Sequence, residues 1–133
     1  MHPDIDKLRV SSVLNKNTKD FGGKFMLDGS GETCWNSDQG SPQDITITFK
    51  EAFMMSKIRI MFQGGFVGVN CEIWIQKQDE DCLLIHRPFY PLDNNHMQTF
   101  DLLEQSSITK LKIVFKDSTD FYGRITIYKL EIL

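Results

Sequence analysis

Apolar and polar residues alternate with a period of two along most of this chain, which is the pattern of half-buried β-strands. The clearest rows place an apolar residue at every second position: Ile45, Ile47 and Phe49; Ile58, Ile60 and Phe62; and Leu111, Ile113 and Phe115. Polar residues, mostly Thr, Lys and Arg, fill the positions between them. Each row therefore predicts a strand with one face turned towards a hydrophobic core.

Further strands are predicted where the same alternation returns between polar segments that contain Gly or Pro. They cover residues 8–14, 69–75, 82–87, 97–103 and 124–133. The acidic turn 78–81 should join two of them in a hairpin, and Pro88 should end the second. A change of parity in the last strand predicts a bulge near Tyr128. Residues 15–24 are the one stretch that could hold a helical turn.

About eight strands with no helices between them favour an all-β fold, an antiparallel β-sandwich, over a parallel sheet. A jelly roll fits this number of strands, and such folds gather several loops at one end. The 133 residues suit a single domain over residues 1–133. Residues 1–7 are polar and contain Pro3, so they are expected to form a flexible lead-in that either frays or lies extended.

A tight polar turn precedes the first tryptophan of the chain. The side chain of Asp28 can form a hydrogen bond with the nearby backbone, and Gly29 allows a positive φ, so this pair strongly favours a turn. The oxygens of Asp28, Ser30 and Thr33 could then converge, which is the arrangement that a hard cation requires. Trp35 follows directly, and its position favours a buried core residue over a sugar-stacking one.

The pattern D-G-x-x-x-T-x-W, carried by Asp28, Gly29, Thr33 and Trp35, resembles the signature loop of galactose-binding-like domains. This β-sandwich family includes discoidin and coagulation-factor C domains and many carbohydrate-binding modules. Other stretches are similar to a small group of such proteins that associate with an orphan nuclear receptor: 11–14, 35–40, 62–66, 93–95, 98–100 and 120–124. The resemblance covers nearly the whole chain.

The resemblance implies a metal site in the signature loop. The carbohydrate-binding members hold a structural calcium ion there, together with an acidic residue near the end of the chain, and Glu131 is the matching position here. The expected ligands are therefore Asp28, Ser30, Thr33 and Glu131. Two carboxylates predict a modest affinity. The alternative is that Asp28 only caps the turn while Thr33 bonds locally, with no metal bound.

Arg124 is the main candidate for binding a partner. It follows Tyr122 in a loop that the resembling domains turn towards their ligands, and a planar guanidinium beside aromatic rings suits a carboxylate, a sugar hydroxyl or a peptide. The alternative is an ion pair with Asp117 or Asp120 that only fixes the loop. Phe66, Asn94 and Asn95 are weaker candidates in other loops.

Trp74 is a second kind of candidate, because it has the opposite parity to Ile73 and Ile75. It should be either exposed or covered by a neighbouring loop. An exposed tryptophan would indicate a contact surface, although a single apolar residue on a surface is common.

Charge and cysteine content narrow the partners and the compartment. The 15 basic and 18 acidic residues give a net charge of −3, without the basic footprint of a dedicated nucleic-acid binder. Lys110, Lys112 and Lys116 could line up with Lys57 and Arg59 in a basic stripe, but a solvated strand face has the same pattern. No apolar run is long enough to span a membrane. Three cysteines and the absence of a signal-peptide pattern favour an intracellular, reduced compartment. The resemblance implies a nuclear setting, so the expected location is the nucleus, the cytoplasm or both.

No nucleophile, base and orienting group come together in the sequence, so the chain is not expected to be an enzyme. The first hypothesis is a non-catalytic protein-interaction module. The resemblance implies that its partner is an orphan nuclear receptor, and that it represses receptor-driven transcription by hindering DNA binding. The absence of an L-x-x-L-L motif means that such a contact would use the folded surface. The alternative is a calcium-assisted carbohydrate-binding module.

Overall fold

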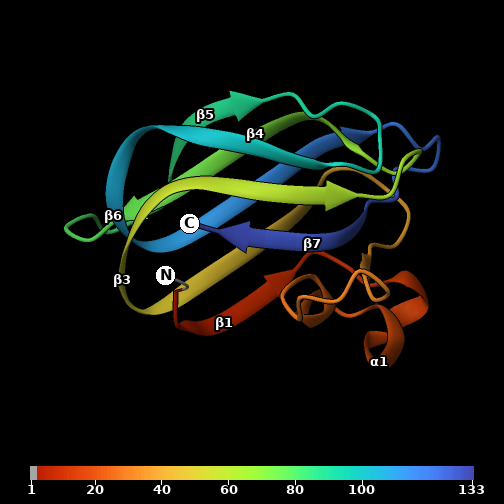
Figure 1. Cartoon of the computed structure of the whole chain (residues 1–133), viewed down its shortest axis with the longest axis horizontal. Coiled ribbons are helices and arrows are strands. Elements are labelled where there is room, and N and C mark those ends of the chain that lie inside the picture. Colours follow the sequence, from red (N-terminus) through yellow and green to blue (C-terminus); the bar gives the residue numbers. More distant parts are fainter. Residues whose placement is uncertain (1–2) are drawn as a thin grey trace.

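A computed structural model of the chain describes residues 3–133, which form two packed layers of antiparallel β-strands (Figure 1). The strands are β1 (Ile5–Val10), β2 (Trp35–Asn36), β3 (Gln43–Phe62), β4 (Gly68–Lys77), β5 (Leu84–Phe89), β6 (Met97–Ser118) and β7 (Thr126–Ile132). The short helices α1 (Thr18–Phe21), η1 (Leu14–Lys16) and η2 (Gly23–Met26) all lie between β1 and β2. None of these helices is long and apolar enough to cross a membrane.

Two long strands, β3 and β6, run through both layers. They pair with each other from Gln43 opposite Phe115 to Thr48 opposite Lys110, and again from Lys57 opposite Asp101 onwards, with shifts of register between these segments. β1 and β4 join the first part of β3 and the last part of β6, and β5 extends this layer, which we call the first sheet. β7 and β2 join the last part of β3 in the second sheet. The bent strands therefore fold the sheet onto itself as a sandwich.

The predicted all-β antiparallel sandwich is confirmed, with seven strands in place of about eight. The strands expected around residues 45–50 and 58–62 are one continuous β3, and those expected over 97–103 and around 110–116 are one continuous β6. The short β2 was not expected, because Trp35 and Asn36 are too few residues to show alternation. Pro88 lies inside β5 and does not end it, since β5 is an edge strand that can lose a backbone donor.

Residues 5–7 of the lead-in expected over residues 1–7 lie extended, which was one of its two expected forms, but they are paired as the start of β1, so the flexibility expected of them is wrong. Ile5 pairs with Phe49 and Lys7 pairs with Thr48, and the N–H of Lys50 donates to the carbonyl oxygen of Asp4 at 2.9 Å. The side chain of Ile5 also packs against the core, which compensates the polar residues around it. Residues 1–2 of this expectation lie outside the described part of the chain.

The core lies between the two sheets and is built from the predicted apolar rows, all of which are buried. Trp35 is 0% exposed, as expected for a core residue, and its Nε1 donates to the carbonyl oxygen of Ser12 at 2.9 Å. The bulge predicted near Tyr128 is confirmed, because Met61 pairs with Lys129 and Phe62 pairs with Ile127, so that Tyr128 is left over.

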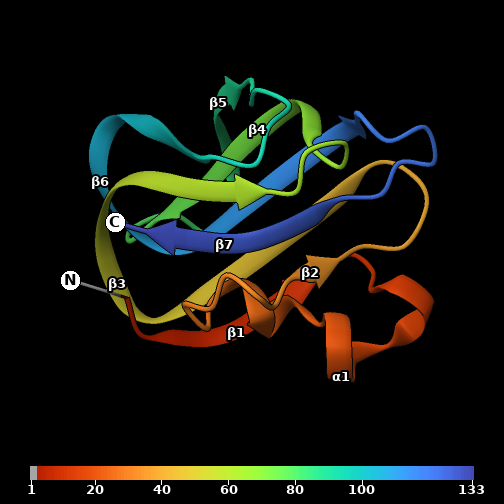
Figure 2. The same cartoon turned by 45° about the vertical axis from the view of Figure 1, so that its right-hand side comes forward.

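The loops gather at one end of the sandwich, opposite the bends of β3 and β6, as Figures 1 and 2 both show. We call this the loop end; it comprises the connections 37–42, 63–67, 90–96 and 119–125. The buried amide of Gln43 fixes one of them: its Oε1 accepts from Ser12 Oγ at 2.7 Å, and its Nε2 donates to the carbonyl oxygen of Gly40 at 2.8 Å. The loop end is thus held by side-chain bonds to the core strands.

At the opposite end, the imidazole of His86 links β5 to β6. The backbone N–H of Leu103 donates to His86 Nε2 at 2.9 Å, so the bond requires a neutral ring. Burial, and then the charge of Lys77, lower the pKa of His86 below its ordinary value of 6.5, against an opposing effect of Glu104. The unfolded chain therefore binds a proton more readily than the folded one.

We expect the free energy of unfolding to be constant above pH 7 and to decrease as the pH falls from about 6.5 to 5. The variant His86→Gln should lose this step, because an amide oxygen accepts from Leu103 at any pH. Denaturant unfolding of both proteins at pH 7.5 and pH 5 measures the difference. An identical decrease in the two proteins would show that the hydrogen bond of His86 is not its cause.

Candidate functional site

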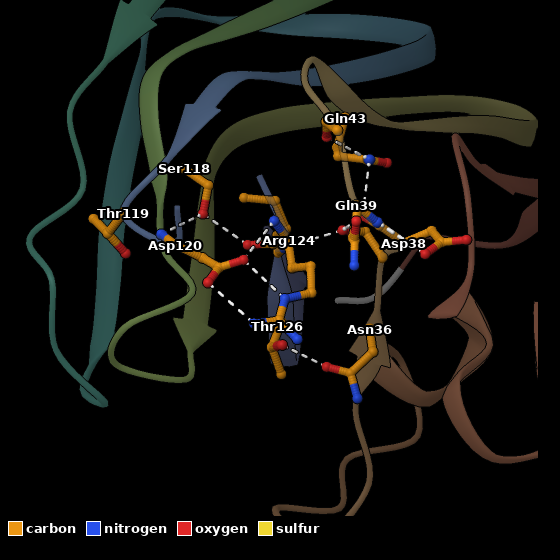
Figure 3. Close-up of polar contacts among 12 residues, drawn as sticks. Asn36, Asp38, Gln39, Gln43, Ser118, Thr119, Asp120, Arg124 and Thr126 are labelled. Atoms are coloured by element: carbon orange, nitrogen blue, oxygen red, sulfur yellow. Dashed lines mark hydrogen bonds and ion pairs between the residues drawn. The ribbon is translucent and has the colours of Figure 1, made fainter. Parts of the chain in front are cut away.

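The loop before β7 carries two of the predicted partner-binding residues, Tyr122 and Arg124, and an ion pair gives it a defined shape. The carboxylate of Asp120 accepts from Arg124 Nε at 2.8 Å and from Arg124 Nη2 at 3.1 Å, and also from the backbone N–H of Arg124 at 3.1 Å (Figure 3). Ser118 Oγ accepts from the N–H of Asp120 and donates to the carbonyl oxygen of Arg124. The ion pair considered for Arg124 is therefore present, with Asp120 as its partner, and it holds the loop.

Gly123 lets this loop pack against its neighbour in the loop end. Its φ is +84°, in the region that favours glycine, and a Cβ atom here would lie 2.8 Å from the backbone carbon of Gly40. The N–H of Gly40 in turn donates to the carbonyl oxygen of Tyr122 at 2.8 Å. The two loops therefore form one rigid support beneath Tyr122.

The guanidinium of Arg124 also lies over two aromatic rings. Its central carbon is 5.2 Å from the ring centre of Phe66 and 5.6 Å from that of Tyr122, which are cation–π distances. Asp120 uses Nε and Nη2, so Nη1 still offers donors to a ligand. Asp120 raises the pKa of Arg124, and the pKa of Asp120 is lowered in return, so both groups keep their charge. We call Phe66, Phe121, Tyr122 and Arg124 the aromatic–arginine cluster.

Phe121 belongs to this cluster although the sequence did not single it out. Its side chain is 92% exposed and stands against the 56% exposed Tyr122, with ring centres 5.3 Å apart and perpendicular planes. Together the two exposed rings form a small apolar patch, and such patches mark contact sites more often than a single exposed ring does. The only sequence signal was its place in the loop before β7, since the loop conformation that exposes it has no periodic pattern.

The other predicted partner-binding residues do not join the cluster directly. Asn95 Oδ1 accepts from the N–H of Gly64 at 2.6 Å, so this side chain holds the turn that leads to Phe66. Asn94 Oδ1 accepts from His96 and Gln98 within its own loop. The side-chain oxygens of both asparagines therefore stabilise the loop end, and neither side chain is hydrogen-bonded to Arg124 in the described part of the chain.

Trp74 lies on the outer face of the first sheet and is half-buried. Its Nε1 donates to Glu72 Oε1 at 3.1 Å, and Lys116 Nζ lies 2.8 Å from Glu72 Oε2. It is thus neither in the core nor in the loop end.

The residues expected to bind calcium fall into two groups around one cavity. Asp28 Oδ2 accepts from Thr33 Oγ1 at 2.5 Å, Asp28 Oδ1 accepts from the N–H of Ser30 at 2.9 Å, and these bonds lower the pKa of Asp28. Thr33 Oγ1 also lies 3.5 Å from the carbonyl oxygen of Phe25. Asp28 and Glu131 line the same cavity of about 480 Å³, and Glu131 faces Arg59 at 3.6 Å.

The donor chemistry of this loop fits calcium in part. Carboxylate, hydroxyl and carbonyl oxygens gather at Asp28, Thr33 and Phe25, as a hard cation requires. However, residues 3–133 contain no group of three or more acidic, His or Cys side chains placed to hold a metal ion. The hydroxyl of Ser30 accepts from the N–H of Glu32 at 3.1 Å, so it acts within the turn.

A smaller cavity of about 180 Å³ lies beside Arg124. It is lined by Leu14, Asn36, Ser37, Gln63, Phe66, Arg124 and Thr126. Asn36 and Thr126 face each other across the β2–β7 pair through a side-chain hydrogen bond (Figure 3). The volume of this cavity is smaller than the roughly 300–1,000 Å³ that is typical of small-molecule sites.

Comparison with solved structures shows the same fold in binding domains of bacterial proteins. A coagulation factor 5/8 type C domain from Bacteroides fragilis superposes with a TM-score of 0.80 at 12% identity, covering 98% of this chain and 95% of its own. The family 32 carbohydrate-binding module of Clostridium perfringens NanJ, solved with galactose, gives 0.79 at 17% identity, covering 95% and 91%. The fold is therefore that of a galactose-binding-like β-sandwich domain. No family model matches the chain.

Sequence comparison identifies a narrower family. The nuclear receptor 2C2-associated protein of Danio rerio is 50% identical over 125 residues, covering 94% of this chain and 88% of the relative. The proteins of the same name from Xenopus laevis and Homo sapiens are 48% and 43% identical, again over 94% of this chain and over 90% and 88% of their own lengths. The chain belongs to the nuclear receptor 2C2-associated protein family.

Proposed function

We propose that this protein is a non-catalytic interaction module that binds an orphan nuclear receptor through its loop end. It acts in the nucleus and represses receptor-driven transcription by hindering the binding of the receptor to DNA. The names of its relatives support a nuclear receptor as the partner. The observation that carries the choice of surface is the exposure of Phe121 and Tyr122 beside an anchored Arg124, because aromatic and arginine side chains are the usual anchors of protein interfaces.

The contact uses the folded surface of this protein. Of the described helices, α1 spans only Thr18–Phe21, which is too short to present the i, i+4, i+7 face that fits a helix-binding groove. The aromatic–arginine cluster offers a small, rigid projection instead. Because its loops are already ordered, little conformational entropy is lost on binding.

A titration of the purified receptor with this protein, followed by a mobility-shift assay on the DNA element of the receptor, tests the proposal. Saturable binding and a matching loss of the receptor–DNA complex are expected. A complex that contains receptor, DNA and this protein together would contradict repression by hindered DNA binding, whereas an absence of binding would contradict the receptor as partner.

Carbohydrate binding is a second candidate, favoured by the cavity beside Arg124 and by the sugar-binding modules that share this fold. The exposed ring of Tyr122 and the free Nη1 of Arg124 could contact a sugar ring and its hydroxyl groups. Adding galactose to isotope-labelled protein should then shift the amide signals of the 119–125 loop. Unchanged signals at millimolar galactose would reject this candidate and leave the receptor proposal intact.

We also propose calcium as a ligand of the signature loop, with Asp28, Thr33 and Glu131 as the side chains that hold it and Ser30 shaping the turn. Calcium at 100 times its dissociation constant should raise the free energy of unfolding by about 2.7 kcal/mol. Thermal unfolding in calcium and in chelator measures this, and Asp28→Asn, which removes a negative charge, should abolish the difference. Equal melting temperatures of the parent protein in both conditions would reject a structural calcium ion.

A further inference from the structure

The strand register places four basic side chains together on the outer face of the first sheet. Directly opposed residues of antiparallel strands point to the same face. The pairs from β1 to β4 align in two rows: Arg9, Thr46, Lys112 and Trp74; and Lys7, Thr48, Lys110 and Gln76. The intervening residues Ile47, Leu111 and Ile75 are buried, so these rows point outwards. We call Lys7, Arg9, Lys110 and Lys112 the basic face.

None of these cations has an acidic partner among the described residues. The ion pairs of the structure use Arg59, Lys77, Lys116 and Arg124. Two acids lie one row beyond Lys112 in the register: Glu72 of β4, which is bound by Lys116 and by the indole N–H of Trp74, and Asp44 of β3, which forms no ion pair among the described residues. Within the two rows the side chains between the cations are neutral, so four cations stand near one acid without an ion pair, Asp44, and the basic face keeps a net positive charge.

The outer face of the second sheet is built differently, although it comes from the same two long strands. There Lys57 lies opposite Asp101 and Arg59 lies opposite Glu131, with the second pair in contact at 3.6 Å. Solvated strand faces in this protein can therefore carry balanced charges. The basic face departs from that pattern in a chain whose net charge is −3.

We propose that the basic face binds an extended, acidic segment of a protein partner. Lys7 and Arg9, like Lys110 and Lys112, stand two residues apart on one strand, a separation of about 6.8 Å. Carboxylates at alternate positions of an extended peptide repeat at the same distance, so acids along the peptide meet cations along the strand. The hydroxyls of Thr46 and Thr48 between the rows add hydrogen-bond partners.

Single-stranded nucleic acid would fit this face less well. Such binders combine cations with several aromatic rings on which bases stack. The face offers one half-buried aromatic residue, Trp74, whose indole N–H is already used. The net negative charge of the whole chain would also repel a polyanion that extends beyond the basic face.

The probes are a fluorescent peptide of alternating Glu and Thr, its Lys–Thr counterpart, and a single-stranded oligonucleotide of mixed sequence, each titrated with the full chain. The Glu–Thr peptide should bind, the Lys–Thr peptide should not, and the affinity should fall with salt as the Debye length shortens from about 10 Å at 0.1 M to about 3 Å at 1 M. The double variant Lys7→Glu/Lys112→Glu should weaken binding about tenfold or more.

The matched control is Lys19→Glu/Lys129→Glu, which changes the net charge equally at cations outside this face. It should keep nearly the parent affinity. An equal loss of peptide affinity in both double variants would show that only the net charge matters, and it would overturn the proposal. Tighter binding of the oligonucleotide than of the Glu–Thr peptide would also overturn it. Melting curves of both variants establish that they are folded, and Arg124→Ala should bind the peptide like the parent, which separates this face from the loop end.

Discussion

Replacing Trp35 with alanine is expected to lower the free energy of unfolding by about 3–5 kcal/mol, the largest effect of any single substitution proposed for this protein. The side chain is completely buried against Phe115, with ring centres 6.4 Å apart. Its indole N–H also satisfies the carbonyl oxygen of Ser12, which would be left without this partner. Because β2 is so short, this side chain is also its main tie to the core.

Denaturant unfolding with a matched tryptophan variant measures this effect. Trp74→Ala removes an equal volume from the outer face of the first sheet, where no closed cavity forms, and should cost no more than about 1 kcal/mol. The variant Trp35→Phe, which keeps most of the buried surface and loses only the N–H donor, should lie between the two. Similar losses for Trp35→Ala and Trp74→Ala would mean that the signature loop does not depend on its buried tryptophan.

Those parts of the fold that follow from alternation could be predicted from the sequence. The rows around Ile47, Ile60 and Ile113 are buried as expected, because a period of two can only place one face of a strand in a core. The extra residue Tyr128 was also readable, since a bulge reverses the parity of the residues after it.

The sequence did not show that two separate rows of alternating residues belong to one continuous strand. Residues 50–57 of β3 change parity where the strand bends from one sheet to the other, and this looks like a loop when only alternation is considered. Likewise, β1 begins at Ile5 because the edge of β3 is there to pair with it, which is a long-range cause that no local pattern of residues 1–7 contains.

The candidate site was predictable in its residue types and less so in its geometry. Arg124, Tyr122 and Phe66 do meet, although Phe66 comes from a different loop, because the sandwich brings the ends of its strands together. The exposure of Phe121 and the internal use of Asn95 depend on loop conformation and on single hydrogen bonds. A lysine pattern alone also could not separate a solvated strand from a basic face, because this difference lies in the cross-strand partners.

Replacing Arg124 with alanine should weaken receptor binding by about 2 kcal/mol or more, roughly 30-fold, if the loop end is the interface. The substitution removes the cation that contacts the rings of Phe66 and Tyr122, and with it the free donors of Nη1. It should cost little stability, no more than about 1 kcal/mol, because Asp120 still accepts the backbone N–H of residue 124 and an ion pair at the surface contributes little.

Titration calorimetry of the receptor with the variants Arg124→Ala, Arg59→Ala and Asp120→Asn measures this loss. It shows whether Arg124 contacts the receptor or only keeps the loop ordered. Arg59→Ala removes an arginine that is ion-paired on the second sheet, outside the loop end, and should bind like the parent protein. Asp120→Asn loosens the loop and leaves the guanidinium in place, so it should cause a smaller loss than Arg124→Ala. An equal loss for Asp120→Asn would assign Arg124 to holding the loop, and the contact itself would then fall to Phe121 and Tyr122, whose rings only that ordered loop can present.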